Sequence, residues 1–129
     1  MTITQNKNVP TGSVEDIEAN EDLQTFYYKQ AGVSYAMFNP DTGALKDINV
    51  RKAINIGIDR EKIAKVLNNV VTPEYGFISE AQAGYSPEYA AKLAKEYSYN
   101  PDEAKALLKE AGYADTDGDG FLDKDGKKL

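Results

Sequence analysis

Cysteine, histidine and tryptophan are all absent from this sequence of 129 residues. Without cysteine the chain has no disulfides, thiolate metal sites or cysteine nucleophiles. Its cysteine content therefore does not indicate whether it belongs to an oxidising or a reducing compartment. Without histidine it has no serine–histidine–aspartate triad, no histidine general base and no imidazole zinc ligand. No pair of carboxylates is flanked by the apolar sequence that separates a catalytic acid from a base. We therefore do not expect an enzyme.

Positive charge and long apolar runs are also scarce. The 15 Lys and Arg residues face 21 Asp and Glu residues, a formal net charge of −6, so nucleic acid is an unexpected partner. No apolar run approaches the roughly 20 residues that span a bilayer, and no transmembrane segment is expected. The first residues contain neither a basic nor an apolar stretch, so this chain shows no export signal.

The length suits one domain with a core of its own. Residues 1–24 are polar and acidic, and they predict a loose entry segment with one helical turn after Ser13. The single predicted domain then covers residues 25–129. A helix-rich α/β domain with a few strands is the expected fold class.

Extended structure is predicted at the start of this domain. Residues 25–38 are rich in aromatic and β-branched side chains, and Val33, Tyr35 and Met37 recur at period two. This pattern predicts two short strands or one bent strand. Residues 39–43 combine Asn, Pro, Asp and Gly and predict a turn.

Four helices are expected, each beginning after a residue whose side chain can accept hydrogen bonds from the first free backbone N–H groups. These caps are Asp47, Asp59, Ser86 and Asn100. The predicted apolar faces are, in chain order, Val50, Ala53, Ile54 and Ile58; Ile63, Val66 and Leu67; Tyr89, Leu93 and Tyr97; and Ala104, Leu107, Leu108 and Ala111. Arg51, Lys52, Lys62 and Lys65 are expected to point outward. Gly112 is expected to end the last helix in a left-handed conformation.

A loop over residues 72–86 separates the second and third helices. It contains Tyr75, Phe77 and Tyr85 together with two glycines. Long aromatic loops in compact domains are often functional, so this loop is a candidate part of a binding site.

The sharpest chemical motif is the run of alternating carboxylates from Asp115 to Asp123. Asp115, Asp117, Asp119 and Asp123 supply hard oxygen ligands at the spacing of a calcium loop, and they are the candidate metal ligands. The twelfth position is Gly126, where a bidentate Glu is needed, so the match is incomplete. The favoured interpretation is an Asp/Gly turn capped by its own side chains. No other cofactor is expected, and no turn signal is evident after this run.

Five motifs in one order resemble the family-5 extracellular solute-binding proteins, the oligopeptide, dipeptide and nickel receptors of ABC importers. The motifs are residues 35–39, residues 45–63, Thr72-Pro73-Glu74-Tyr75-Gly76, residues 100–113, and Asp117-Gly118-Asp119-Gly120 with Asp125-Gly126-Lys127. The resemblance covers roughly residues 33–129 and implies a fragment of the second lobe of a type II periplasmic-binding-protein-like fold.

That resemblance implies a function in peptide import. The full-length parent would close two lobes on a peptide and deliver it to an ABC permease, from the periplasm or as a cell-surface lipoprotein. The resemblance implies that the first lobe is not part of this chain. Tyr35 and Tyr75 fall near the cleft of the family and are the candidate ligand-binding residues. The alternative hypothesis is a calcium-stabilised helical interaction domain built on the loop at residues 115–123.

Overall fold

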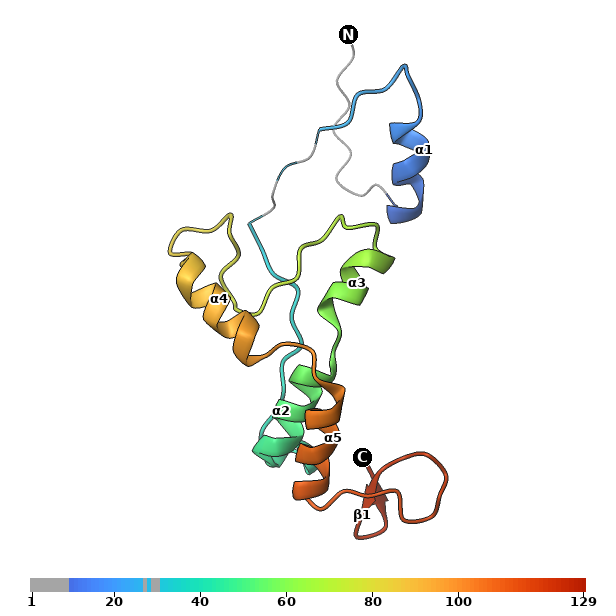
Figure 1. The fold of residues 1–129 in the computed structure, drawn as a ribbon, viewed down its shortest axis with the longest axis vertical. Coiled ribbons are helices and arrows are strands. Elements are labelled where there is room, and N and C mark those ends of the chain that lie inside the picture. The colour runs from blue at the N-terminus through green and yellow to red at the C-terminus, as the bar shows by residue number, and fades with distance from the viewer. Residues whose placement is uncertain (1–9, 27, 29–30) are drawn as a thin grey trace.

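The computed structural model describes residues 10–26, 28 and 31–129. Its elements follow in the order η1 (Thr11–Ser13), α1 (Val14–Glu18), η2 (Gly43–Lys46), α2 (Ile48–Gly57), α3 (Arg60–Val66), α4 (Pro87–Glu96), α5 (Pro101–Glu110), β1 (Asp123–Lys124) and β2 (Lys127–Lys128). Figure 1 shows an elongated molecule in which α2 and α5 lie side by side, α3 and α4 lie above them, and the β1–β2 hairpin lies below α5.

The α2–α5 pair carries the hydrophobic core. Ala53 and Ile56 of α2 are buried with Ala104 of α5, and Tyr97, Leu107 and Leu108 pack against them. Small side chains at the crossing allow the two helix backbones to approach closely. Ile56 is part of this core although the predicted face did not include it, while the predicted Ile58 is 37% exposed.

Helix capping follows the sequence prediction closely. The side chains of Asp47, Asp59, Ser86 and Asn100 each accept a hydrogen bond from a backbone N–H in the first turn of α2, α3, α4 and α5. Asn100 also donates to Glu103 Oε2 at 2.8 Å, which completes a reciprocal capping box. Gly112 has φ +86°, the predicted left-handed end of α5.

Of two smaller predictions, the one for Ser13 is partly confirmed and the one for Arg51 is wrong. A helical turn follows Ser13, as predicted, but the Ser13 side chain makes no capping hydrogen bond. Arg51 does not point outward. Its guanidinium donates to the carbonyls of Leu45 and Lys46, at 2.7 and 3.0 Å, and so fastens η2 to α2.

The strands predicted within residues 25–38 are not found in the described part of that segment. Tyr27 lies outside the described residues. Residues 33–38 run as chain without a paired neighbour, and Tyr35 and Met37 are 61% and 80% exposed. A strand forms only where a second strand accepts and donates its backbone hydrogen bonds, and side-chain pattern alone does not supply that neighbour.

The apolar face predicted for α3 forms, but it is not a buried face. Ile63 and Val66 are 48% and 72% exposed, and Ala64 is the buried residue of this helix. An amphipathic pattern predicts which side chains share a face, while burial depends on what packs against that face.

A β-hairpin forms near the end of the chain, where the residue pattern predicted no turn but the resemblance of residues 117–127 to the solute-binding family implied the approach to a hairpin. β1 and β2 are antiparallel, with Asp123 opposite Lys128 and Lys124 opposite Lys127. The two residues between the strands, Asp125 and Gly126, have φ +53° and +70°, as a type I′ turn requires. Asp-Gly is a strong signal for this turn, but the flanking residues are charged and lack the alternating hydrophobic pattern that usually accompanies it.

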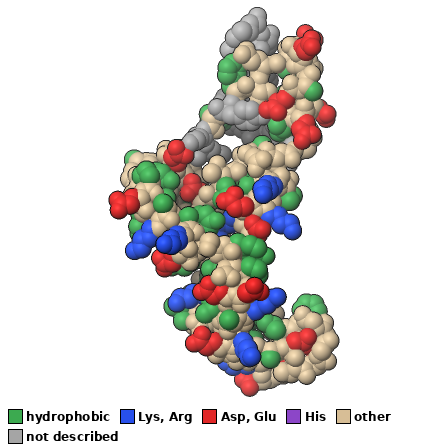
Figure 2. All heavy atoms as spheres, viewed as in Figure 1, with side chains coloured by type: hydrophobic (Ala, Val, Ile, Leu, Met, Phe, Trp, Pro, Cys, Tyr) green, Lys and Arg blue, Asp and Glu red, His purple; other side chains and the backbone are tan. Residues whose placement is uncertain are grey.

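The accessible surface is large for the chain length. The chain exposes 10356 Å², whereas a compact monomer of this mass exposes about 6,800 Å². Figure 2 shows hydrophobic side chains at the surface along the molecule, among acidic and basic ones. Within the described residues, no helix is both long enough and apolar enough to cross a membrane.

Candidate functional site

Tyr35 lies against the aromatic loop that follows α3. Its ring meets the ring of Phe77 edge-on, with centroids 5.6 Å apart and planes at 81°. Aromatic pairs favour this geometry because the positive ring edge of one meets the negative face of the other. Both rings remain largely exposed, at 61% and 75%. They therefore form an exposed aromatic surface.

Tyr75 lies under a positively charged side chain. The guanidinium carbon of Arg60 is 5.0 Å from the centroid of the Tyr75 ring, which is a cation–π contact. Arg60 is itself held by Asn55, because it donates to the Asn55 carbonyl at 3.0 Å and to the Asn55 side-chain oxygen. The end of α2 thus fixes Arg60, and Arg60 fixes the half-buried Tyr75.

The two aromatic contacts are linked through the loop. Tyr75 and Phe77 are separated by Gly76, where an added Cβ would lie 3.3 Å from Leu93 Cδ1 of α4. The absence of a side chain at Gly76 lets the loop lie close to α4. Tyr35 therefore contacts the loop at Phe77, two residues away from Tyr75.

The sequence analysis did not identify Phe77 as the contact of Tyr35, or Arg60 as the contact of Tyr75. Tyr75 and Phe77 do recur at period two, and this spacing was the available signal for a shared aromatic surface.

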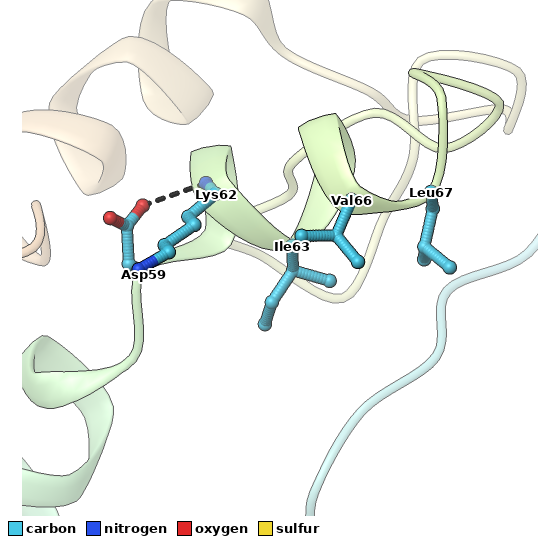
Figure 3. A pocket seen from close by; sticks show the side chains of 5 residues that line it. All are labelled: Asp59, Lys62, Ile63, Val66 and Leu67. Atoms are coloured by element: carbon cyan, nitrogen blue, oxygen red, sulfur yellow. Dashed lines mark hydrogen bonds between the residues drawn. The ribbon is translucent and has the colours of Figure 1, made fainter.

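An open apolar hollow of about 420 Å³ lies on α3. The lining residues are Asp59, Lys62, Ile63, Val66 and Leu67. In Figure 3 the side chains of Ile63, Val66 and Leu67 extend from the same side of the helix. Asp59 turns toward the helix, since it accepts a hydrogen bond from the backbone N–H of Lys62 at 2.8 Å. Asp59 and Lys62 are the charged residues at its border, and the other three lining residues are apolar.

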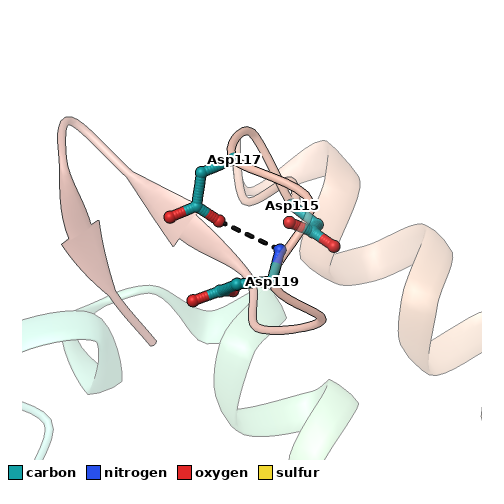
Figure 4. Close-up of side chains that lie close together, drawn as sticks. All are labelled: Asp115, Asp117 and Asp119. Carbon is teal, nitrogen blue, oxygen red and sulfur yellow. Dashed lines mark hydrogen bonds between the residues drawn. The ribbon is translucent and has the colours of Figure 1, made fainter.

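The aspartate loop brings three of its four candidate ligands together. One carboxylate oxygen each from Asp115, Asp117 and Asp119 lies within 4.8 Å of the others, and Figure 4 shows the three side chains around the loop. Asp123 does not join this group in the described structure. Both of its oxygens accept from the Thr116 hydroxyl at 2.7 Å.

The loop's own backbone supplies hydrogen-bond donors to these carboxylates. Asp115 accepts from the N–H groups of Gly118 and Gly120, at 2.7 and 3.0 Å. Asp117 accepts from Asp119, and Asp119 accepts from Phe121. Such local bonds are typical of turns capped by aspartate side chains. The geometry is that of the favoured turn interpretation, and its three clustered oxygens still suit a hard cation such as calcium.

Two carboxylates of this loop are held in the ionised form. The Lys128 ammonium pairs with Asp119, and this pairing, helped by the Phe121 N–H, lowers the Asp119 pKa. The Thr116 hydroxyl and backbone N–H lower the pKa of Asp123. Donors to a carboxylate favour its charged form, which is the physical cause of both shifts.

The chain resembles solute-binding proteins along nearly its whole length. The family described as "Bacterial extracellular solute-binding proteins, family 5 Middle" matches residues 3–129. The oligopeptide-binding protein AppA from Bacillus subtilis, solved in complex with a nonapeptide, matches at 32% identity and a TM-score of 0.69. That match covers 94% of this chain and 24% of AppA, so the chain spans about a quarter of its structural relative.

No curated protein matches in a sequence comparison. The family match begins at residue 3, earlier than the motifs that first indicated the resemblance. Its partial coverage of AppA agrees with the prediction of a helix-rich piece of a periplasmic-binding-protein-like fold. Family and fold thus agree, and the chain belongs to family 5 of the bacterial extracellular solute-binding proteins.

Proposed function

We propose that this chain contributes part of the second lobe of an extracytoplasmic receptor that binds oligopeptides for an ABC importer. The observation that carries the proposal is the 32% identity with AppA across 94% of the chain. AppA is an oligopeptide-binding protein that was solved with a nonapeptide. The permease of the importer and a first lobe are the partners that such a receptor requires.

The aromatic loop supports a role in ligand binding. A peptide receptor works by shape and hydrogen bonding and needs no nucleophile, so the absence of histidine and cysteine is compatible with it. Tyr35 with Phe77 offers exposed aromatic surface, and Tyr75 is oriented by Arg60. Rigid aromatic side chains contribute contact area at a low cost in conformational entropy. We assign Tyr35 and Tyr75 as the residues that face the peptide.

A chimeric receptor tests this proposal. This chain replaces the matching quarter of AppA, and binding of the nonapeptide is measured by titration calorimetry. We expect the chimera to bind. Substituting Tyr35→Ala or Tyr75→Ala in the chimera is expected to weaken binding about tenfold, the usual effect of removing a buried aromatic anchor.

Tyr99→Ala is the matched control, because Tyr99 is a similarly exposed tyrosine between α4 and α5. It is expected to leave the affinity within about twofold, as rim contacts do. A chimera that has the circular dichroism spectrum of a folded receptor and fails to bind the nonapeptide would overturn the proposed function. Equal weakening by all three substitutions would overturn the assignment of Tyr35 and Tyr75.

A further inference from the structure

A second hollow, of about 480 Å³, lies between η2 and the C-terminal hairpin. The β1–β2 hairpin that borders it lies at the end of the α2–α5 pair opposite α3 and α4 (Figure 1), so the hollow is separate from the aromatic loop. Its charged lining residues are Lys46, Lys124, Lys127, Lys128, Asp47 and Asp125. Four cations and two anions therefore border one hollow, in a chain whose formal net charge is −6.

One anion and one cation of this lining are already engaged, and the second anion offsets part of the remaining positive charge. Asp47 caps α2 and accepts the Asn49 N–H at 2.8 Å. Asp125 borders the hollow from the exposed hairpin turn, so its single carboxylate opposes the lysines. Lys128 pairs with Asp119, outside the hollow. Three lysines remain to give the hollow its positive charge.

One of these lysines is fixed in place. Lys124 Nζ donates to the carbonyl of Ala111 at 2.6 Å and lies 5.5 Å from the centroid of the Tyr113 ring. Its aliphatic chain crosses Gly112, where an added Cβ would come within 3.3 Å of it. A lysine ammonium has three N–H donors. Ala111 uses one of them, and the others are left to bind a ligand.

The other two lysines carry uncompensated charge. Across the part of the chain that the structure describes, the Lys46 and Lys127 ammonium groups have no hydrogen-bonded or ionic partner. Lys127 is also directly opposite Lys124 in the hairpin. Like charges in cross-strand positions destabilise a hairpin. A multivalent anion between them would remove this repulsion.

We propose that this hollow binds a small phosphate-bearing anion, held by Lys46, Lys124 and Lys127. Charge-assisted hydrogen bonds to phosphate oxygens are among the strong ones, and lysine is a common phosphate ligand. A volume of about 480 Å³ accommodates one phosphate or pyrophosphate group and a short attached moiety. The phosphate comes from a soluble ester or from a phospholipid headgroup, and the experiment distinguishes these sources.

Titration calorimetry of the whole chain with inorganic pyrophosphate, at low ionic strength, tests the site. We expect saturable binding with a stoichiometry of one. The double variant Lys46→Gln/Lys127→Gln is expected to weaken binding at least tenfold. Lys62→Gln/Lys65→Gln, which removes two exposed lysines from α3, is the charge-matched control and is expected to change the affinity less than twofold. Circular dichroism verifies that each variant keeps its helices.

Sedimentation with phosphatidylglycerol vesicles, compared with phosphatidylcholine vesicles, identifies the source. Binding to phosphatidylglycerol that the double variant loses supports the proposal with a lipid headgroup as ligand. Pyrophosphate binding without vesicle binding supports it with a soluble ester. The proposal is overturned if pyrophosphate shows no saturable binding at up to about 10 mM, a concentration that detects even weak binding. It is also overturned if Lys62→Gln/Lys65→Gln weakens binding as much as Lys46→Gln/Lys127→Gln.

Discussion

The backbone N–H of Asn100 donates to the carbonyl of Ile56 at 2.8 Å, so the start of α5 is tied to the last turn of α2. The Asn100 side chain caps α5 at the same point. One residue therefore sets both the beginning of a helix and its position on its partner.

Replacing Asn100 with alanine is expected to destabilise the α2–α5 pair by about 1 kcal/mol, the usual cost of losing a side-chain cap. The backbone bond to Ile56 needs no side chain and is retained. Urea denaturation followed by circular dichroism measures the change. Ser98→Ala is the control, since its hydroxyl makes only a long 3.4 Å bond to Lys95. Equal effects of the two substitutions would contradict the role given to Asn100.

Two valines with the same chemistry and opposite burial provide a second test. Val50 of α2 is 0% exposed and Val66 of α3 is 72% exposed. Val50→Ala is expected to lower the free energy of unfolding by about 2 kcal/mol, because it removes two buried methyl groups and leaves a cavity. Val66→Ala is expected to change it by less than about 0.5 kcal/mol. A large loss at Val66 would show that the α3 face is covered.

Acid is expected to loosen the aspartate loop and its hairpin. Asp119 and Asp123 have pKa values below the ordinary 3.8 when the loop is formed. A carboxylate with a lowered folded-state pKa stabilises the fold above its unfolded-state pKa, and the effect is lost as the pH falls through the folded-state value. The stabilisation is therefore complete at neutral pH, begins to fall near the unfolded-state pKa of about 4, and is lost as the pH falls through the lowered folded-state pKa values.

NMR signals of Gly118 and Gly120 during a pH titration follow this loosening. Asp119→Asn and Thr116→Val are each expected to reduce the pH dependence, while Asp22→Asn, in the distant entry segment, is not. A titration identical in all variants would show that the hairpin does not depend on these carboxylates.

Calcium is expected to leave the melting temperature unchanged. The clustered oxygens of Asp115, Asp117 and Asp119 accept from the loop backbone, and Lys128 already supplies a positive charge to Asp119. Thermal melts with about 1 mM calcium, an extracellular concentration, and then with chelator measure this directly. A midpoint that rises with calcium and falls with chelator would favour the calcium-stabilised alternative, since a ligand of the folded state raises the midpoint.

By itself, this chain is expected to bind short peptides too weakly to measure. A receptor that closes two lobes around its ligand obtains its contacts from both of them, and this chain spans 24% of AppA. Titration calorimetry with the nonapeptide, performed in parallel with the AppA chimera, compares the two. A micromolar dissociation constant for the chain alone would show that it needs no second lobe.

Local signals in the sequence predicted the helices well. Each cap acts within three residues of its own position, so Asp47, Asp59, Ser86 and Asn100 could be identified without knowledge of the fold. The strand predicted around Tyr35 failed because pairing needs a distant partner.

The candidate site shows the same division between local and distant information. Tyr35 and Tyr75 could be nominated as aromatic residues in suitable segments. Their contacts with Phe77 and Arg60 join different parts of the chain, and no spacing rule predicts them. The apolar face of α3 is exposed for the same reason, because a sequence defines an apolar face but not the element that covers it.

The concentration of packing on α2 and α5 has a consequence for how the molecule opens. Where few apolar groups are buried, segments separate from the rest at a lower free energy than global unfolding requires. Backbone amides of α1, α3 and α4 should accordingly exchange with deuterium well before those around Ala53 and Ala104. This chain would then lose its structure in stages, from its upper helices inward, and not in a single cooperative event.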